Sequence, residues 1–262
     1  MPHIENQVAI VTGSTAGIGR GIAERLAAQG VAVVVTGRQE SRAGQVAAEI
    51  ESRGGTAAGF AFDLEDNDSL ETLIDRTVAT FGRLDILVNN ARSVASALPL
   101  ESLTKAQMRA AFSANIDNVF LLTLAAHPHL KATKGTVINI GSVVVHRHLL
   151  GLPIYTIIKG ALLQMTKALA AEWAGDGIRV NAVNPGFTRT DFFSELGVSR
   201  EEADRILEFY RRYVPLGEIG KPGDIGGLVA WLASDAARFL TGAVIDADAG
   251  YSVRGLPMYG AA

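Results

Sequence analysis

Residues 8–19 read Val8-Ala-Ile-Val-Thr-Gly-Ser-Thr-Ala-Gly-Ile-Gly19, and this segment gives the strongest indication of the fold. It reads as an apolar strand that runs into a glycine-rich turn and then into a helix. Gly13 permits a tight turn, Gly17 lets the backbone approach a pyrophosphate, and Gly19 lets helix and strand pack closely. The free N–H groups and the positive dipole end of the following helix favour phosphate. The glycines alone would also fit a plain turn, but their place between strand and helix predicts a dinucleotide-binding turn.

The rest of the chain alternates between short apolar runs and amphipathic stretches. The runs predict strands at Val8–Thr12, Val31–Thr36, Thr56–Ala61, Leu84–Asn89, Thr136–Ile140, Arg179–Val183 and Ala243–Asp246. The stretches between them predict helices at Ile18–Gln29, Ser41–Arg53, Ser69–Phe81, Thr104–Val119, Tyr155–Ala174 and Asp224–Ser234. Near-continuous apolar strands are typical of a parallel sheet buried on both faces. The pattern predicts an α/β fold: a single doubly wound Rossmann domain over residues 1–262, with a seven-stranded parallel sheet and helices on both faces.

One segment, Gly186–Gly223, interrupts this alternation. Its middle part, Ser199–Tyr213, is helix-like and is expected to lie over the carboxyl edge of the sheet, where open α/β folds bind ligands. We interpret the segment as a lid or substrate wall; the alternative is an insertion without a role in binding.

Composition excludes several classes of protein. Of the 262 residues, 48% are hydrophobic and 19% charged, which indicates a globular chain, and the net charge of −3 gives no electrostatic reason to expect nucleic acid or an anionic membrane as a partner. Cysteine is absent, which excludes disulfides, thiolate catalysis and cysteine-bound metal. The N-terminus shows no signal-peptide pattern, and the apolar runs are shorter than the roughly 20 residues of a membrane span. We therefore expect a soluble, cytoplasmic protein.

The second predicted strand ends in Gly37 and Arg38. An acidic residue there would bind the adenosine ribose of NAD, whereas an arginine can pair with the 2′-phosphate of NADP. The alternative is that Arg38 is an ordinary solvated loop residue. Asp63 follows the third strand and could accept a hydrogen bond from the adenine amino group or cap a helix.

Tyr155 and Lys159 lie four residues apart on a predicted helix, so their side chains project from one face. A tyrosine has a pKa of about 10, and a neighbouring ammonium group favours its phenolate form. Ser142 follows the fifth strand directly and could hold a substrate oxygen beside the tyrosine. Each feature alone is common: a tyrosine–lysine pair is often a surface contact, and a serine after a strand is often a helix cap or part of a turn. Their joint occurrence downstream of a dinucleotide turn carries the argument.

The combined motifs resemble the short-chain dehydrogenase/reductase superfamily in its compact form, and within it the 3-oxoacyl-carrier-protein reductase-like branch. The resemblance spans roughly residues 5 to 250. The motifs that carry it, in family order, are Thr12-Gly-Ser-Thr-Ala-Gly-Ile-Gly19, Asn89-Asn-Ala91, Asn115, Ser142, Tyr155-Thr-Ile-Ile-Lys159, Asn184-Pro-Gly186 and Thr190.

The resemblance implies four catalytic residues. Tyr155 would be the general acid and base, and Ser142 would orient the substrate oxygen. Lys159 would lower the pKa of the tyrosine and bind the nicotinamide ribose, and Asn115 would anchor a water in a proton relay. It also implies a homotetramer or homodimer built from helices such as Thr104–Val119 and Tyr155–Ala174.

The cofactor expected from turn, strand end and resemblance together is NADP, with NAD as the alternative. The residues expected to bind it are Gly13, Thr15, Gly17, Ile18, Gly19, Arg38, Asp63, Leu64, Asn90, Ala91, Tyr155, Lys159, Pro185, Gly186, Thr188 and Thr190.

Three positions depart from the family pattern. Arg92 replaces the glycine that usually follows Asn-Asn-Ala, and would be strained if the backbone there needs a positive φ. Ala16 stands where many NADP-preferring members have a basic residue. The turn Val143-Val-Val-His-Arg-His148 is unusually basic, so with Arg92 it could recognise an anionic substrate; the alternative is a set of solvated loop residues. The candidate substrate contacts are Arg92, Val144, His148, Phe187 and Phe192.

The sequence thus predicts an oxidoreductase that moves a hydride between NADP(H) and a secondary alcohol/ketone pair, with 3-oxoacyl thioesters as one substrate class. The alternatives are an NAD-dependent alcohol, hydroxy-acid or sugar dehydrogenase of the same family, or a catalytically silent dinucleotide-binding regulator. A sugar-nucleotide epimerase would need a different glycine spacing.

No metal is expected, since His127 and His129 lie without clustered carboxylates after the helix that carries Asn115. Trp173 and Trp231 are expected to be packing residues, and the tail Ser252–Ala262 to reach a neighbouring subunit or the substrate pocket.

Overall fold

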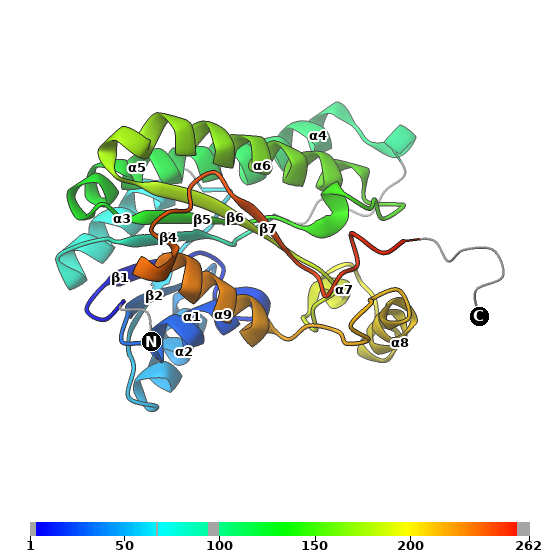
Figure 1. The fold of residues 1–262 in the computed structure, drawn as a ribbon, viewed down its shortest axis with the longest axis horizontal. Helices are drawn as coiled ribbons and strands as arrows, with labels where there is room; N and C mark the ends of the chain where they lie inside the picture. Colours follow the sequence, from blue (N-terminus) through cyan, green and yellow to red (C-terminus); the bar gives the residue numbers. More distant parts are fainter. Residues whose placement is uncertain (1–3, 67, 94–99, 256–262) are drawn as a thin grey trace.

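The computed structural model describes residues 4–66, 68–93 and 100–255, and Leu256, Pro257 and Met258 of the tail lie outside them. Within these residues the strands form a parallel seven-stranded sheet in the order β3-β2-β1-β4-β5-β6-β7 (Figure 1). The strands are β1 (Val8–Val11), β2 (Ala32–Gly37), β3 (Thr56–Ala61), β4 (Ile86–Asn89), β5 (Thr136–Ile140), β6 (Arg179–Pro185) and β7 (Val244–Ala247). The predicted doubly wound α/β fold is confirmed.

The helices alternate with the strands. They are α1 (Gly17–Ala27), α2 (Glu40–Glu51), α3 (Asp68–Phe81), α4 (Lys105–Phe112), α5 (Asn118–Thr133), α6 (Pro153–Trp173), α7 (Phe192–Glu195), α8 (Arg200–Arg211) and α9 (Pro222–Ala233), with short 3-10 turns at Leu100–Ser102, Val143–Val145, Ala174–Asp176 and Asp235–Ala237.

Two apolar layers hold the helices against the sheet. Successive strand residues point to opposite faces, so Val33 and Val35 pack on one side and Val34 on the other. One layer joins the sheet to α1, α2 and α9, and the other joins it to α3, α5 and α6 (Figure 1). The near-continuous apolar strands follow from this burial on both faces.

The strand order reverses direction between β1 and β4, because β2 and β3 lie on one side of β1 and β4 to β7 on the other. In such sheets ligands bind in the crevice outside the carboxyl ends of the strands at the reversal. The glycine-rich turn follows β1 at this point, and α7 and α8 lie beyond the carboxyl edge of β6 (Figure 1).

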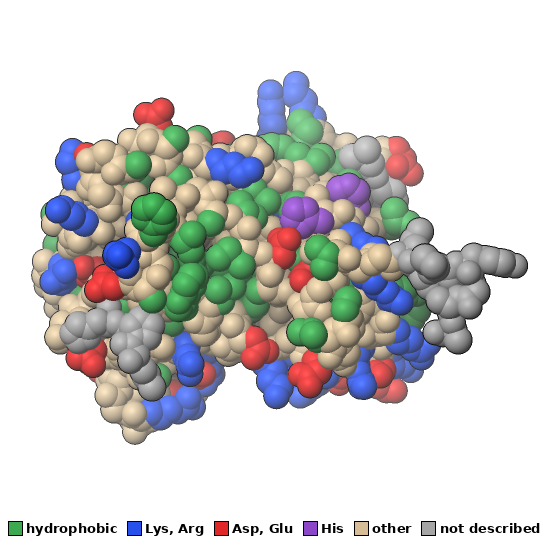
Figure 2. Space-filling view, in the orientation of Figure 1, with side chains coloured by type: hydrophobic (Ala, Val, Ile, Leu, Met, Phe, Trp, Pro, Cys, Tyr) green, Lys and Arg blue, Asp and Glu red, His purple; other side chains and the backbone are tan. Residues whose placement is uncertain are grey.

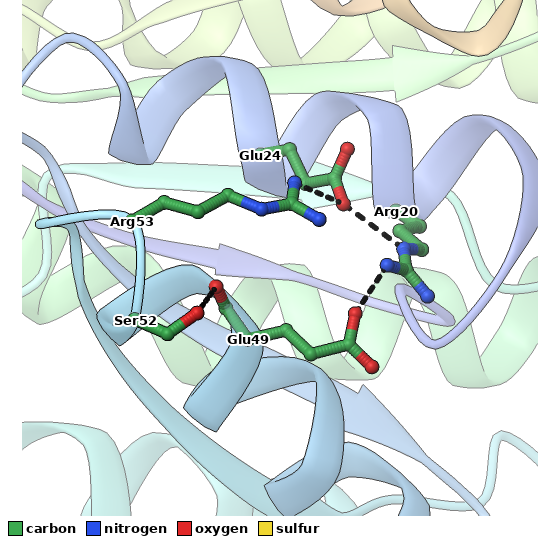
Figure 3. A network of polar contacts seen from close by, with 5 residues as sticks. All are labelled: Arg20, Glu24, Glu49, Ser52 and Arg53. Carbon is green, nitrogen blue, oxygen red and sulfur yellow. Dashed lines mark hydrogen bonds and ion pairs between the residues drawn. The ribbon is translucent and has the colours of Figure 1, made fainter.

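A charged network ties α1 to α2. Arg20 donates hydrogen bonds to Glu24, one turn along α1, and to Glu49 of α2, and Arg53 reaches Glu24 at 3.2 Å (Figure 3). The guanidinium of Arg20 is therefore held between α1 and α2 by two carboxylates.

The predicted helix Thr104–Val119 is wrong in its extent. Instead, α4 passes through a π-helical turn at Ser113–Asp117 into α5, which continues to Thr133 with Pro128 inside it. Leu122, Ala126 and Leu130 are fully buried against the sheet, and this burial outweighs the helix-breaking tendency of the proline. His127 and His129 therefore lie within the helix, not after it.

The two tryptophans differ in burial. Trp173 is buried as predicted, but Trp231 is 38% exposed on α9, so its prediction as a packing residue is wrong. Hydrophobic side chains gather around α9 and β7 on the face shown in Figure 2, where basic and acidic side chains are intermixed near the edges.

Candidate active site

A cavity of about 630 Å³ lies at the carboxyl edge of the sheet. Its wall includes every residue that the sequence predicted for cofactor binding, together with Ser142, Arg92, Val144, Phe187 and Phe192. The segment Gly186–Gly223 contributes Phe193, Glu195 and Leu207 of α7 and α8 to the wall. The fold therefore brings the predicted site residues together from separate parts of the chain.

The glycine-rich turn forms a tight cradle at one end of the cavity. Gly13 has φ +63°, in the left-handed region, and a Cβ at Gly19 would lie 2.4 Å from the Gly13 carbonyl oxygen and from Nδ2 of Asn90. That amide donates to the carbonyl oxygens of Thr12 (2.8 Å) and Gly13 (3.1 Å). Asn90 thus fixes the turn from the end of β4.

Arg38 and Asp63 lie at the same end of the cavity. Arg38 is exposed, and no ion pair of its guanidinium occurs within the described residues. The Asp63 carboxylate accepts from the backbone N–H of Glu65 at 3.0 Å, and α3 begins only at Asp68. Asp63 therefore closes a local turn and does not cap α3.

Tyr155 projects from the first turn of α6 into the opposite end of the cavity. Burial raises the pKa of its hydroxyl, while the positive charge of Arg92 and a hydrogen bond with Ser142 lower it. The Ser142 backbone N–H donates to Oδ1 of Asn184 at 3.1 Å, which fixes the end of β5 against β6. Tyrosine and serine hydroxyls therefore meet at one point of the cavity.

Lys159 is buried one turn further along α6. Its Nζ donates to the Ile140 carbonyl oxygen at 2.7 Å and lies 5.7 Å from the Tyr155 ring centre. Burial, with a further contribution from Arg92, lowers the pKa of Lys159 to about 7.

Asn115 lies in the π-helical turn between α4 and α5, outside the cavity wall formed by the described residues. Its Nδ2 donates to the Ala111 carbonyl oxygen at 2.9 Å, and its Oδ1 accepts from the Ser93 backbone N–H at 3.0 Å. The side chain joins the end of the β4 loop to this turn.

Arg92 follows β4 by three residues and extends along the cavity wall. Nη2 is 2.7 Å from Oε2 of Glu195, and Cζ lies 4.7 Å from the centre of the Phe192 ring. Its backbone φ is not positive: the non-glycine residues described with positive φ are Asn6, Lys134 and Ala249. The strain considered for an arginine at this position is therefore absent.

The basic residues of the turn after Ser142 contact different parts of the protein. His146 lies 3.2 Å from Asp246, and Nδ1 of His148 is 3.0 Å from the Val144 carbonyl oxygen. Arg147 lines the cavity, but its Nη2 donates to the Arg254 carbonyl oxygen and its Cζ lies 5.3 Å from the Tyr251 ring centre. His148 lines a separate cavity of about 360 Å³, unlike the other candidate substrate contacts.

Aromatic rings line the tyrosine end. Phe192 of α7 lies 5.9 Å from Tyr155, centre to centre, while Phe187 stacks on Tyr210 of α8 at 4.2 Å and meets Tyr251 edge-on. Phe187 thus both lines the cavity and packs the segment. Tyr251 and Glu195 were missed by sequence reasoning, since neither lies in a motif that marks a site.

No group of three or more histidine, aspartate or glutamate side chains in the described residues could hold a metal ion. No helix among them combines the length and apolar character needed to cross a membrane.

Comparisons with known proteins cover nearly the whole chain. A family model described as enoyl-(acyl carrier protein) reductase matches residues 13–252. An uncharacterized oxidoreductase of Methylorubrum extorquens is 39% identical over 251 residues, 95% of this chain and 99% of that protein. A 4-formylbenzenesulfonate dehydrogenase of Comamonas testosteroni is 35% identical over 253 residues, 96% of this chain and 100% of that protein. A 3-oxoacyl-[acyl-carrier-protein] reductase of Aquifex aeolicus is 34% identical over 249 residues, 94% and 98% of the two chains.

Solved structures agree with these matches. The crystal structure of a dehydrogenase/reductase from Sinorhizobium meliloti 1021 is 38% identical and superposes with a TM-score of 0.85, covering 95% of this chain and 96% of that one.

Proposed function

Since the chain belongs to the short-chain dehydrogenase/reductase family and is an NAD(P)-dependent oxidoreductase, we propose that it transfers a hydride between NADP(H) and a secondary alcohol/ketone pair. Tyr155 is the general acid and base of this reaction. The observation that carries the proposal is the convergence of Tyr155, Ser142 and Lys159 in the cavity that also contains the glycine-rich turn.

The cradle around the glycine-rich turn suits a dinucleotide. The backbone crowds Gly19 so closely that it leaves no room for a side chain, and the N–H groups at the start of α1 face the cavity that a pyrophosphate would enter. Thr188, Thr190 and the Pro185-Gly186 turn would hold the nicotinamide end. When bound, the cofactor supplies or accepts the hydride.

In the reductive direction, the Tyr155 hydroxyl donates its proton to the ketone oxygen as that oxygen gains negative charge. The Ser142 hydroxyl donates a hydrogen bond to the same oxygen and so stabilises the developing alkoxide. Lys159, when charged, favours the phenolate that remains. With a pKa of about 7, Lys159 can hold or release a proton near neutral pH.

Asn115 acts differently from the other three residues. Both ends of its side-chain amide are engaged by the backbone of Ser93 and Ala111. We propose that Asn115 positions the π-helical turn beside the first turn of α6. Held in this place, the turn would bind the water that links Lys159 to a proton relay.

Three observations support NADP over NAD. Arg38 is exposed at the cavity wall without an ion-pair partner in the described residues, so it can pair with a 2′-phosphate. A Cβ at Gly37 would lie 2.7 Å from Cγ2 of Thr15, so an acidic side chain at this position requires Thr15 to move. Arg20 is held by Glu24 and Glu49 (Figure 3), which leaves Arg38 to make the contact.

The protein is proposed to form a dimer or tetramer. Several large apolar side chains are each more than a third exposed. Those on α4 to α6 are Met108, Phe120, Leu121, Leu124 and Ile157, and two others are Trp231 on α9 and Phe239 before β7. Exposed apolar patches of this kind mark protein–protein interfaces. Light scattering coupled to size-exclusion chromatography tests this, and a monomer at working concentration would contradict it.

The names of two relatives refer to different substrates, one to a 3-oxoacyl group and the other to a formylbenzenesulfonate. A panel of ketones, 3-oxoacyl thioesters and anionic carbonyls, followed by nicotinamide absorbance with NADPH and with NADH, tests the proposed reaction. We expect carbonyl-dependent oxidation of NADPH. Absence of turnover across all of these classes with both cofactors would contradict the proposal.

A further inference from the structure

Arg92 presents an unusual arrangement at the tyrosine end of the cavity. Its side chain is only 21% exposed, and its guanidinium lies over the Phe192 ring. Nη2 is engaged by Glu195, whereas Nη1 is buried and has no hydrogen-bond partner among the described residues. A buried guanidinium N–H is expected to meet an acceptor, since leaving it without one is unfavourable.

The position of Arg92 makes the substrate a suitable source of that acceptor. The Phe192 ring contacts the Arg92 guanidinium on the one hand and the Tyr155 ring on the other. The positive charge is near enough to lower the pKa of both Tyr155 and Lys159. A molecule whose reacting carbonyl lies at Tyr155 therefore occupies the same cavity that Arg92 lines.

Glu195 holds this arginine through Nη2 and leaves Nη1 without a partner among the described residues. Its carboxylate is half exposed on α7 and binds the solvent side of the guanidinium through Nη2. The Phe192 face restricts the guanidinium plane, which holds Nη1 in a fixed orientation for donation to an oxygen anion. The other arginine at this end, Arg147, is engaged by Tyr251 and by the Arg254 carbonyl.

We propose that Arg92 binds an anionic oxygen group of the substrate through Nη1, so that the enzyme acts on short oxo acids and the matching hydroxy acids. The carboxylate lies one or two carbons from the reacting carbonyl, with Glu195 and Phe192 holding the guanidinium. This inference rests on the proposed function and adds the substrate class to it.

The test compares a short 2-oxo acid and a short 3-oxo acid with their methyl esters, which keep the ketone and remove the charge. For the wild-type protein with saturating NADPH, we expect kcat/KM to favour the better acid over its ester by about tenfold or more. In Arg92→Met we expect kcat/KM for the acid to fall by at least about tenfold more than kcat/KM for the ester does. Arg92→Lys should recover part of the loss.

Arg189→Met is the matched control. Arg189 lies in the segment Gly186–Gly223 that carries Phe192 and Glu195, is ion-paired with Asp204 on the surface and does not line the cavity. Its acid-to-ester ratio should equal that of the wild type.

Binding gives a second readout that needs no turnover and no stable Arg92→Met protein. The short oxo acid and its amide are titrated by thermal shift against the wild-type and Arg92→Lys complexes with NADP⁺, which cannot reduce them. We expect the acid to stabilise the wild-type complex more than the amide does, and this difference to shrink in Arg92→Lys. Equal behaviour of charged and neutral compounds in the wild type would overturn the inference. Reduction of the esters in that case would leave the proposed function standing, which separates the two failures.

Discussion

The ammonium group of Lys159 donates a hydrogen bond to the Ile140 carbonyl oxygen at 2.7 Å and so joins α6 to the carboxyl end of β5. Ile140 precedes Ser142 by two residues, and Tyr155 lies one turn before Lys159. One contact therefore fixes the helix that carries the tyrosine against the strand that carries the serine. It also holds a lysine in a buried place, where its charge is disfavoured.

The burial of Lys159 predicts a pH-dependent stability for the cofactor-free protein. Its pKa falls from 10.5 to about 7 on folding, so between these values the unfolded chain binds more protons and stability rises with pH. Lys159→Met removes this titration. The melting temperature of the variant minus that of the wild type should be larger at about pH 6 than at about pH 9, by about 2 °C or more.

Lys167→Met, on an exposed position of the same helix, is the control and should show no such trend. A temperature difference for Lys159→Met that stays constant across this range would contradict the assigned burial.

Arg92 predicts a shift in the pH profile of alcohol oxidation. In the proposed mechanism the phenolate of Tyr155 is the active base in this direction, and the positive charge of Arg92 lowers the pKa of Tyr155. For an uncharged secondary alcohol, kcat/KM should rise with pH as Tyr155 loses its proton. In Arg92→Met the midpoint of this rise should therefore move to higher pH. Arg189→Met should keep the wild-type midpoint, and a downward shift in Arg92→Met would contradict the electrostatic assignment.

Glycine-to-alanine changes should have opposite effects on stability in the glycine-rich turn and in the helix α2. At Gly19 a Cβ would lie 2.4 Å from the Gly13 carbonyl oxygen, so Gly19→Ala should destabilise the protein by about 1–3 kcal/mol and weaken NADPH binding. At Gly44 of α2 a Cβ meets nothing within 4 Å, so Gly44→Ala should stabilise the helix by about 0.5–1 kcal/mol. Fluorescence titration and thermal unfolding measure both, and equal NADPH affinity in the two variants would argue against a phosphate cradle at this turn.

Much of the fold could be predicted because its signals are local. Apolar runs buried on both faces gave the strands to within two residues at either end, and the spacing of Gly13, Gly17 and Gly19 marked the turn. The extent of α5 could not be predicted from local signals, since Pro128 normally ends a helix and only the sheet beneath shows why this helix continues.

The site was predictable to the same degree. Tyr155 and Lys159 are one helical turn apart, so their common face follows from the sequence. The pairing of Arg92 with Glu195 joins residues 103 positions apart, and Tyr251 reaches the cavity from beyond β7. Neither follows from a local pattern, because only the folded chain brings them together.

The proposed preference for NADP depends on Arg38. Loss of a charge-assisted hydrogen bond to the 2′-phosphate should raise the KM for NADPH in Arg38→Ala by about 10- to 100-fold and leave the KM for NADH nearly unchanged. Arg53→Ala, whose side chain is exposed in the α1–α2 network of Figure 3, should leave both values unchanged. A wild-type preference for NADH would refute the assignment of Arg38.

The role of Tyr155 as general acid and base is tested most directly by the kcat of Tyr155→Phe, measured beside the Kd for NADPH of the same protein. The change removes one hydroxyl and keeps the ring against Phe192. We predict a fall in kcat of about 10²- to 10⁴-fold with a Kd for NADPH within about twofold of the wild type, and no change in Tyr213→Phe, an exposed tyrosine outside the cavity wall. A kcat for Tyr155→Phe within about threefold of the wild type would contradict the role of Tyr155 as the general acid and base.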